Sequence, residues 1–447
     1  MLDKRLVRNF DFLLFILILL ITGIGLFGIS LATRSPVGET DGAVSEAIGS
    51  FNLRQVKLQI VWFASGLVLM LAVISIDYHT IGDLSMYFYW LVVGLLIAVI
   101  FLGTKGGGAQ SWIAIGPYRL QPSEFSKIAI ILALAQIISK REEKGINNFR
   151  SIVMLFLTLA IPFVLVFLQP DAGTAMVLIV IFMGMIFVGG IHYKLLFAAI
   201  GAGIAAIPIV WFNFLDSYQK HRILVFLNPS MDPLGKGYHA TQSKIAIGSG
   251  QLTGRLGSGG FLFENMLSQL NFLPAKDTDF IFSVTVEALG FLGGITIIVL
   301  YFLLLMRTMR IATKARDTLG SLICAGVASM ILFHVFESIG MAMGIMPITG
   351  IPLPFMSYGG SFMWTNMLLV LSSMSACAGK RLHFRRLSFE HCFDCPRQEK
   401  RRYDKLMYCL SADTEKSPVM RYRYHRKAGG RCNRAYDSPF SFRADGR

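Results

Sequence analysis

Asp279 is the residue of this sequence best placed to do chemistry. It stands immediately before an apolar segment, in the run Asp277-Thr278-Asp279-Phe280. Partial removal from water beside such a segment raises the basicity of a carboxylate toward that of a general base. The alternative is that Asp279 caps the helix that follows, and its position alone leaves both roles open.

Other charged side chains interrupt apolar segments or stand at their ends, where an ionisable group is costly and usually has a reason. Glu124 and Lys127 are spaced i, i+3, so on a helix they share one face and neutralise each other. Asp171 follows Gln-Pro and is suited to capping the next helix. Glu287 and Glu337 lie inside apolar segments. Each has two possible roles that the sequence leaves open. One is a buried carboxylate hydrogen-bonded between helices, and the other is a direct role in the function of the protein.

A long segment before Asp279, from about 215 to 279, combines cationic side chains with a glycine-dense run from Gly248 to Gly260. Basic groups beside glycine-rich backbone suit an anionic, phosphate-bearing ligand. Flexible loops have the same composition, so the run is weak support by itself. The candidate cations are Arg222, Lys236, Lys244 and Arg255.

Composition excludes a water-soluble enzyme. Of the 447 residues, 54% are hydrophobic and 15% are charged, the mean hydropathy is +0.58, and soluble domains carry about 25% charged residues. The net charge is +15, and the part from Lys380 to Arg447 holds 18 Lys and Arg against 8 Asp and Glu. A basic surplus often indicates nucleic-acid binding. Here it lies on a tail and beside apolar segments, where membrane orientation explains it, so no nucleic-acid partner is expected.

Apolar segments long enough to cross a hydrocarbon core, which takes about 17 to 25 residues, predict an all-α polytopic membrane protein. We expect ten such helices, with one large extracytoplasmic loop between the seventh and the eighth. The segments are Phe12–Ala32, Ile60–Ile76, Met86–Leu102, Phe125–Ile138, Ile152–Leu168, Ala172–Val188, Leu195–Phe214, Phe280–Met306, Leu319–Gly344 and Phe362–Ala378.

Orientation follows from the Lys and Arg residues of the short connections, which are more numerous on the cytoplasmic side. One side has Lys4, Arg5, Arg8, Lys140, Arg141, Lys144, Arg150, Lys194, Arg307, Arg310, Lys314 and Arg316, and the other has Arg34, Arg54, Lys105 and Arg119. This predicts cytoplasmic termini and an outer loop at about 215–279. The domains are then a membrane domain, 1–379, and a basic, disordered cytoplasmic tail, 380–447. Cys392-x-x-Cys395 has no second close pair, so a zinc site in the tail is disfavoured and no disulfide is expected.

The predicted topology brings the charged residues to one membrane face. Glu124, Lys127, Asp171, Asp279 and the turn Pro354-Phe-Met-Ser-Tyr-Gly-Gly360 all fall toward the outer side, although more than 200 residues separate the first from the last. Such convergence indicates a single outward-opening site. Ser357 of this turn and Glu287 join the supporting or substrate-binding candidates.

Several motifs in the same order resemble the SEDS family of bacterial shape, elongation, division and sporulation proteins, over about Leu13 to Ala378. The motif Ile-Pro-Leu-Pro resembles the corresponding motif of the elongation members more than that of the division members. The matching stretches are Gln121-Pro-Ser-Glu-Phe-Ser-Lys127, Gln169-Pro-Asp-Ala-Gly173, Asp232-Pro-Leu-Gly-Lys-Gly-Tyr238, Gln242-Ser-Lys-Ile-Ala-Ile-Gly-Ser-Gly250, Phe272-Leu-Pro274, Thr278-Asp-Phe-Ile-Phe282, Gly350-Ile-Pro-Leu-Pro354 and Ser357-Tyr-Gly-Gly-Ser361.

The resemblance implies a peptidoglycan glycosyltransferase that polymerises lipid II at the outer face of the plasma membrane and releases undecaprenyl pyrophosphate. It also implies a partner transpeptidase, a class B penicillin-binding protein, among other elongation-complex proteins. Asp279 matches the essential aspartate of the family, and Glu124, Lys127 and Asp171 match residues considered important. One carboxylate can act as base on the attacking hydroxyl, while cationic groups or a divalent cation, Mg²⁺ or Mn²⁺, stabilise the leaving pyrophosphate.

The sequence departs from the family pattern at Ala275, Asp277 and Ala288, where members typically have glutamate, histidine and a second glutamate. Asp277 could raise the pKa of Asp279 or share a metal ion with it. The tail after Arg386 resembles nothing in the family and is either a regulatory extension or out-of-frame sequence. A lipid II flippase and a non-catalytic scaffold of the wall-synthesis complex remain alternatives, although no internal repeat of the kind transporters use is visible.

Overall fold

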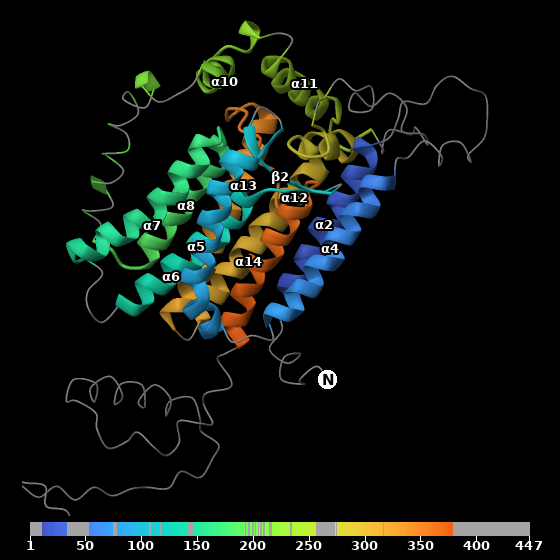
Figure 1. Cartoon of the computed structure of the whole chain (residues 1–447). Helices are drawn as coiled ribbons and strands as arrows, with labels where there is room; N and C mark the ends of the chain where they lie inside the picture. The colour runs from blue at the N-terminus through green and yellow to red at the C-terminus, as the bar shows by residue number, and fades with distance from the viewer. Residues whose placement is uncertain are drawn as a thin grey trace, which may run out of the picture. The chain divides into compact units, whose positions relative to one another are not determined.

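Long apolar helices make up most of the described chain in this computed structural model (Figure 1). The structure describes residues 11–33, 53–74, 78–106, 109–116, 118–141, 147–192, 217–232, 235–255, 273, 275–315 and 317–378, with isolated residues between 194 and 213. All of them belong to the first of two units, Met1–Phe384. The tail and its Cys392-x-x-Cys395 motif lie outside the described residues.

Nine of the ten predicted segments coincide with described helices, and the seventh, 195–214, lies mostly outside the described residues. Seven of the described helices are long and apolar enough to cross a membrane, while α8 is a shorter apolar helix of 17 residues. The protein is therefore an all-α polytopic membrane protein. The bounds are α2 Phe12–Ala32, α4 Leu53–Ile74, α5 Tyr78–Leu102, α6 Pro122–Arg141, α7 Phe149–Leu168, α8 Ala172–Val188, α12 Ile281–Lys314, α13 Thr318–Met343 and α14 Gly360–Ala378.

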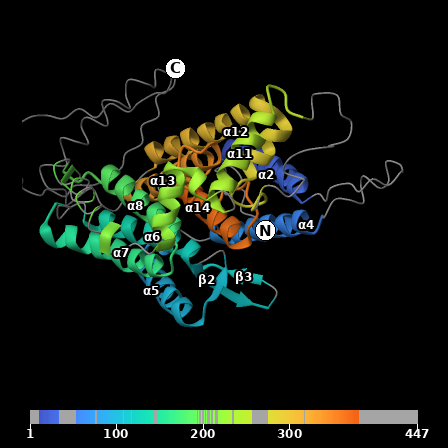
Figure 2. The same ribbon diagram turned by 90° about the horizontal axis from the view of Figure 1, so that it is seen from above.

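Helix α6 is the most enclosed of the candidate spans. In its most apolar window 89% of the residues are buried, against 17% for α4, and α6 packs against α5, α7, α8, α13 and α14. Seen along the helices in Figure 2, α6, α13 and α14 lie between α12 and α2 on one side and α5 and α7 on the other. Enclosure by protein explains why α6 tolerates charged side chains that lipid would not accept.

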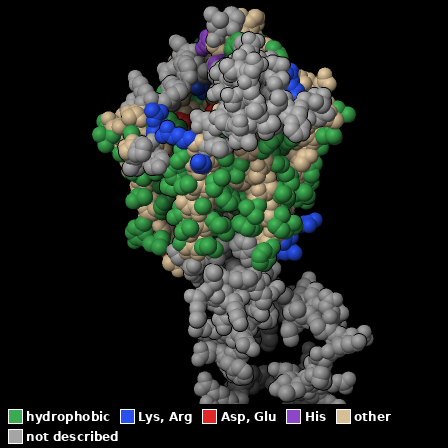
Figure 3. Space-filling model, turned by 90° about the vertical axis from the view of Figure 1, so that its right-hand side faces the viewer, with side chains coloured by type: hydrophobic (Ala, Val, Ile, Leu, Met, Phe, Trp, Pro, Cys, Tyr) green, Lys and Arg blue, Asp and Glu red, His purple; other side chains and the backbone are tan. Residues whose placement is uncertain are grey.

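The outward faces of the helices are apolar, as contact with lipid requires. Figure 3 shows hydrophobic side chains forming a band over the described helices, with Lys and Arg mostly at its margins. Large exposed side chains such as Phe101, Phe156 and Phe302 belong to these faces.

A small sheet follows α5, and the sequence analysis did not anticipate it. Strands β1 Thr104–Gly106, β2 Ala109–Ile115 and β3 Tyr118–Leu120 form an antiparallel sheet in the order β1-β2-β3. The register pairs Ile113 with Leu120 and Ile115 with Tyr118 across a turn that contains Gly116 at φ 60°. Strands this short leave almost no periodic signal in a sequence, and the sheet is held by tertiary contacts with α5 and α6.

The predicted outer loop is largely helical where it is described. It contains α10 Ser217–Leu227, the 3-10 turn η1 Pro229–Met231 and α11 Lys236–Ser249. In Figure 1 these elements lie with β2 at one end of the helices. The second part of the glycine-dense run, 256–260, and the residues 261–272 that follow it lie outside the described residues.

Helix α12 is interrupted at Gly290, where φ is 71° and ψ is −168°. The interruption frees two backbone N–H groups, and both are satisfied by the segment that follows α11. Phe291 donates to the carbonyl of Gln251 over 2.9 Å, and Leu292 donates to that of Leu252 over 3.2 Å. Only glycine adopts this backbone conformation readily. The broken helix therefore serves as the docking point for the end of the 217–255 region.

Candidate functional site

Asp279 lies in a tight turn, 275–280, that leads into α12. The backbone N–H groups of Asp279 and Phe280 both donate to the carbonyl of Ala275, over 3.1 and 3.2 Å. The N-cap position of α12 is occupied by Phe280, without a side-chain cap. Asp279 is half-buried and stands one residue before the cap position. The N-cap position therefore falls one residue later than the sequence suggested, on Phe280.

A second turn, 353–358, fastens the Asp279 turn in place. Ser357 is buried, and its hydroxyl donates to the carbonyl of Thr278 over 2.7 Å while accepting from the N–H of Leu353 over 2.8 Å. Tyr358 adds a backbone hydrogen bond to the carbonyl of Asp277, over 3.0 Å. In this structure Ser357 supports the site by joining the two turns rather than by facing a ligand.

Gln59 of α4 holds the second turn from the opposite side. Its side chain is buried, donates from Nε2 to the carbonyl of Ser357 over 3.0 Å, and accepts at Oε1 from the N–H of Gly359 over 3.2 Å. An amide that uses both its donor and its acceptor end in this way fixes the position and the direction of the chain. Sequence analysis found no signal for Gln59, because its partners are about 300 residues away.

Gly350 brings the backbone of the segment after α13 close to the carboxylate of Asp279. Its φ is 80°, and a methyl group added at its Cα would lie 3.4 Å from Oδ2 of Asp279, at ordinary van der Waals distance. Glycine is therefore favoured here by the backbone conformation.

Asp171 caps α8, as the sequence predicted, and gathers further polar groups. Its carboxylate accepts from the N–H of Thr174 over 3.1 Å and from the Thr174 hydroxyl over 2.9 Å. Gln121 and Ser123, at the start of α6, each donate to Oδ2 over 3.2 Å. Asp171 thus links the beginnings of α6 and α8.

Glu124 and Lys127 form the predicted ion pair, with 2.7 Å between Oε2 and Nζ. Glu124 is 4% exposed and Lys127 is 1% exposed. The ammonium group also lies 3.2 Å from Nε2 of His334 and 5.3 Å from the centroid of the Phe362 ring. Nδ1 of His334 lies 2.9 Å from the carbonyl oxygen of Met330, so that nitrogen carries the proton and Nε2 accepts from Lys127.

This arrangement makes Glu124 and Lys127 a neutralised pair inside the bundle. Both side chains have their charges compensated by protein groups, so neither is presented to a ligand in this structure. Their part in the site is to anchor the beginning of α6, which carries the groups that bind Asp171.

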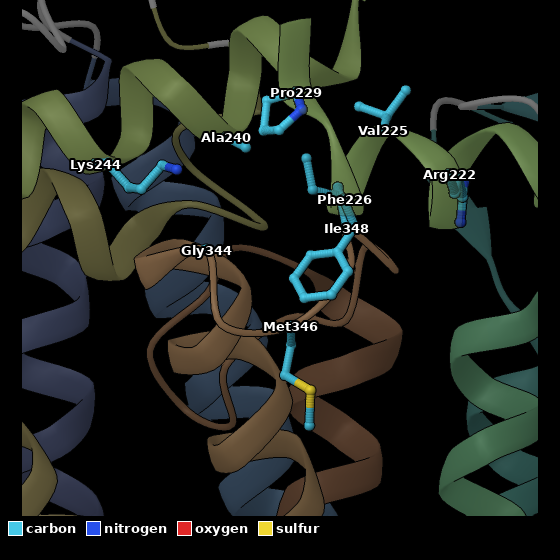
Figure 4. A pocket seen from close by; sticks show the side chains of 9 residues that line it. All are labelled: Arg222, Val225, Phe226, Pro229, Ala240, Lys244, Gly344, Met346 and Ile348. Carbon is cyan, nitrogen blue, oxygen red and sulfur yellow. The ribbon is translucent and has the colours of Figure 1, made fainter. Parts of the chain in front are cut away.

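Two of the candidate cations, Arg222 and Lys244, line one recess beneath α10 and α11. Figure 4 shows Lys244 on one side, Arg222 on the other, and Met346 and Ile348 below them. The recess is small and partly open to solvent, and its remaining lining is largely apolar. Nη1 of Arg222 donates to the carbonyl of Thr349 over 3.2 Å, which places the recess next to Gly350 and the Asp279 turn.

The remaining candidates are placed differently. Glu287 is fully buried, with Oε1 3.9 Å from Nε of Arg255, so Arg255 is engaged by a carboxylate. Lys236 is the first residue of α11, and its side chain lies outside the described residues. In the Asp279 turn, burial lowers the pKa of Lys276 below its usual value, and the charge of Asp277 opposes this shift.

Comparison with known proteins assigns the family. Residues 12–376 match the model of the FtsW/RodA/SpoVE cell cycle proteins. The chain belongs to this family. It is 40% identical to the peptidoglycan glycosyltransferase MrdB of Escherichia coli K12 over 300 residues, 67% of this chain and 79% of the relative. It is 35% identical to the peptidoglycan glycosyltransferase RodA of Treponema pallidum over 436 residues, 81% of this chain and 96% of the relative.

Solved structures of FtsW/RodA/SpoVE proteins have the same fold. A chain of a peptidoglycan synthase complex, described as coordinating polymerization and crosslinking, superposes with a TM-score of 0.67 and 27% identity, covering 83% of this chain and 99% of that one. The rod shape determining protein RodA of Thermus thermophilus superposes with a TM-score of 0.60, covering 83% of this chain and 98% of that one. Its sequence identity is 24%, so that likeness concerns the fold alone.

The Asp279 turn would supply only part of the ligand set of a divalent cation. Among the described residues, no group of three or more His, Cys, Asp or Glu is arranged to hold a metal ion. Asp277 and Asp279 would supply two carboxylates at most, and the remaining ligands of Mg²⁺ or Mn²⁺ would have to come from water or a phosphate-bearing substrate.

Proposed function

We propose that this protein is a peptidoglycan glycosyltransferase that polymerises lipid II into glycan strands at the outer face of the plasma membrane, during cell elongation and shape maintenance. The observation that carries the proposal is the placement of the half-buried carboxylate of Asp279 between two mutually hydrogen-bonded turns, beside a recess lined by Arg222 and Lys244. Relatives named peptidoglycan glycosyltransferases, 40% and 35% identical, support the same activity.

In the proposed reaction, the carboxylate of Asp279 takes the proton from a hydroxyl of the acceptor sugar. The oxygen of that hydroxyl forms a bond to the anomeric carbon of the donor sugar, with inversion, through an oxocarbenium-like transition state. The bond between that carbon and the pyrophosphate oxygen breaks, and undecaprenyl pyrophosphate leaves with the electron pair. A pyrophosphate leaving group needs little protonation, so one carboxylate base is sufficient.

Arg222 and Lys244 suit the leaving group. Two cations on opposite sides of a recess can bind a diphosphate, and the apolar lining between them lowers the local dielectric and strengthens that attraction. A divalent cation bound with the substrate would add charge stabilisation of the same kind. Asp277 would be the carboxylate of the turn that holds it, since Asp279 is the proton acceptor.

The proposed orientation has both termini in the cytoplasm and the Asp279 end outside. The basic residues Lys140 and Arg141 end α6, and Lys314 ends α12, whereas Gln121 and Asp279 stand at the opposite ends of these helices. This asymmetry fits the excess of Lys and Arg found in cytoplasmic connections. Lipid II would then be polymerised on the side where the cell wall lies.

The proposed partner is a class B penicillin-binding protein that cross-links the new strands. The likeness to a chain of a peptidoglycan synthase complex, at 27% identity, supports assembly with such an enzyme. Other proteins of the elongation complex would join the pair.

The deciding experiment is polymerisation of lipid II by the purified chain with its transpeptidase partner, in lipid vesicles, with the glycan products separated on gels. Strands made by the wild type and not by Asp279→Asn support the proposal. Vesicles that translocate lipid II without forming strands would favour the flippase. Absence of both activities, with the partner still bound, would favour a scaffold.

A further inference from the structure

Glu337 is a buried carboxylate that the proposed reaction does not use. It lies near the end of α13, is 2% exposed, and accepts a hydrogen bond at Oε1 from the hydroxyl of Thr349 over 2.8 Å. A buried carboxylate is costly unless hydrogen bonds compensate it. The hydrogen bond between Glu337 and Thr349 therefore stabilises both the end of α13 and the segment that contains Thr349.

The backbone of Thr349 is held from a further direction. Nη1 of Arg222, on α10, donates to its carbonyl oxygen over 3.2 Å. The N-terminal turn of α8 is close by, since a methyl group added at Gly173 would lie 3.3 Å from the same oxygen. The side chain of Thr349 is thus held by α13, and its carbonyl group by α10.

The residue after Thr349 lies close to the proposed base. Gly350 continues the chain with φ at 80°, and a methyl group added at its Cα would lie 3.4 Å from Oδ2 of Asp279. Because one peptide unit joins Thr349 to Gly350, a shift of Thr349 moves the backbone next to the Asp279 carboxylate. The hydrogen bond between Glu337 and Thr349 is therefore connected to the position of Asp279.

We propose that Glu337 is a positioning residue for the polymerisation reaction: by holding the Thr349 hydroxyl, it fixes the backbone at Gly350 and so the carboxylate of Asp279. The proposal rests on the proposed function of Asp279. A displacement of a catalytic group by about 1 Å can lower a rate by about 100-fold. The reaction should therefore depend on the hydrogen bond more than on the charge of Glu337.

The test compares variants that remove the hydrogen bond with variants that keep it, in the full chain with its partner and lipid II. Thr349→Val removes the hydroxyl at nearly constant shape, and Glu337→Leu removes the acceptor. Both should lower kcat by about 10-fold to 100-fold while KM changes by less than about threefold. Thr349→Ser and Glu337→Gln keep the donor and the acceptor, and should recover most of the lost kcat.

Thr308→Val is the matched control. Thr308 is buried in α12, and its hydroxyl donates to the carbonyl of Leu304 over 2.9 Å, far along the helix from Asp279. Thr308→Val should lower the thermal unfolding temperature about as much as Thr349→Val does. Its kcat should nevertheless stay at the wild-type value. If Thr308→Val lowers kcat as much as Thr349→Val does, the effect is general destabilisation and the proposal is wrong.

Two other outcomes would overturn the proposal. Wild-type kcat for Thr349→Val would show that the hydrogen bond does not matter. A loss in Glu337→Gln as large as that in Glu337→Leu would assign the role to the charge or to proton transfer. Asp279→Asn is measured in parallel, because strand synthesis by that variant would refute the proposed role of Asp279 itself, whatever the Thr349 variants do.

Discussion

Lys127 places its ammonium group 2.7 Å from the carboxylate of Glu124 and 3.2 Å from Nε2 of His334, in a site where both charged side chains are less than 5% exposed. The ion pair is local in sequence, but the histidine comes from α13, 207 positions later. Because the charges of Glu124 and Lys127 are compensated by protein groups, the pair is better suited to holding helices together than to binding a substrate.

Removing one member of this pair should destabilise the protein strongly. Lys127→Met leaves Glu124 buried without its cation, and breaking a buried pair in this way typically costs about 3–5 kcal/mol. The double variant Glu124→Gln/Lys127→Met removes both charges and should recover most of that loss. Thermal unfolding in detergent measures the difference, and equal unfolding temperatures for the single variant and the wild type would contradict the prediction.

Asp279→Asn should abolish strand synthesis while leaving the protein folded, inserted and bound to its partner. Asparagine preserves size but cannot take up the proton, and general bases contribute about 10²- to 10⁴-fold to rates. Asp277→Asn is the comparison, since Asp277 takes part in the same turn chiefly through its backbone carbonyl. If Asp279→Asn is active and Asp277→Asn is not, the base is Asp277.

Gly350→Ala should lower the polymerisation rate. The substitution forces a side chain into a left-handed backbone conformation, at about 1–2 kcal/mol, and places a methyl group against the Asp279 carboxylate. Gly116→Ala is the control, because Gly116 also has a positive φ, at 60°, but a methyl group there meets nothing within 4 Å. Similar unfolding temperatures with activity lost only in Gly350→Ala would verify the prediction, and equal activities would refute it.

Lys244→Ala should raise KM for lipid II by about tenfold, the effect of losing one charged hydrogen bond of about 1.5 kcal/mol. Lys220→Ala on α10 is the control, because Lys220 does not line the recess and should leave KM unchanged. Lys244 is a better target than Arg222, because the guanidinium group of Arg222 also donates a hydrogen bond to the carbonyl of Thr349. An equal rise in KM for both lysine variants would indicate a general electrostatic effect.

The orientation can be tested by labelling single cysteines. Ser230→Cys, in η1, should react with a membrane-impermeant thiol reagent in intact cells, and Thr313→Cys, in the last turn of α12, should not. Both positions are exposed, so reactivity reports the side of the membrane. A parent chain with its native cysteines replaced by serine serves as background. Labelling of Thr313→Cys alone would place the Asp279 end in the cytoplasm.

The amino-acid sequence by itself determined the features that depend on neighbours along the chain. Apolar length predicted the described helices closely, with α2 and α8 at the expected bounds. The i, i+3 spacing predicted the pair of Glu124 and Lys127, and the residues before α8 predicted the cap at Asp171. These features follow from helix geometry within a few residues, which a single sequence contains.

Only the tertiary structure decided which distant groups meet. Sequence reasoning left Glu337 between two roles, and the fold adds a hydrogen bond to Thr349 that no local pattern indicates. It also placed Ser357 among the supporting or substrate-binding candidates, and the fold joins its buried hydroxyl to the carbonyl of Thr278. Gln59 and His334 left no local signal, because their partners are more than 200 residues away. Contacts of this range depend on how helices pack side by side, and the spacing of residues along one helix does not encode that packing.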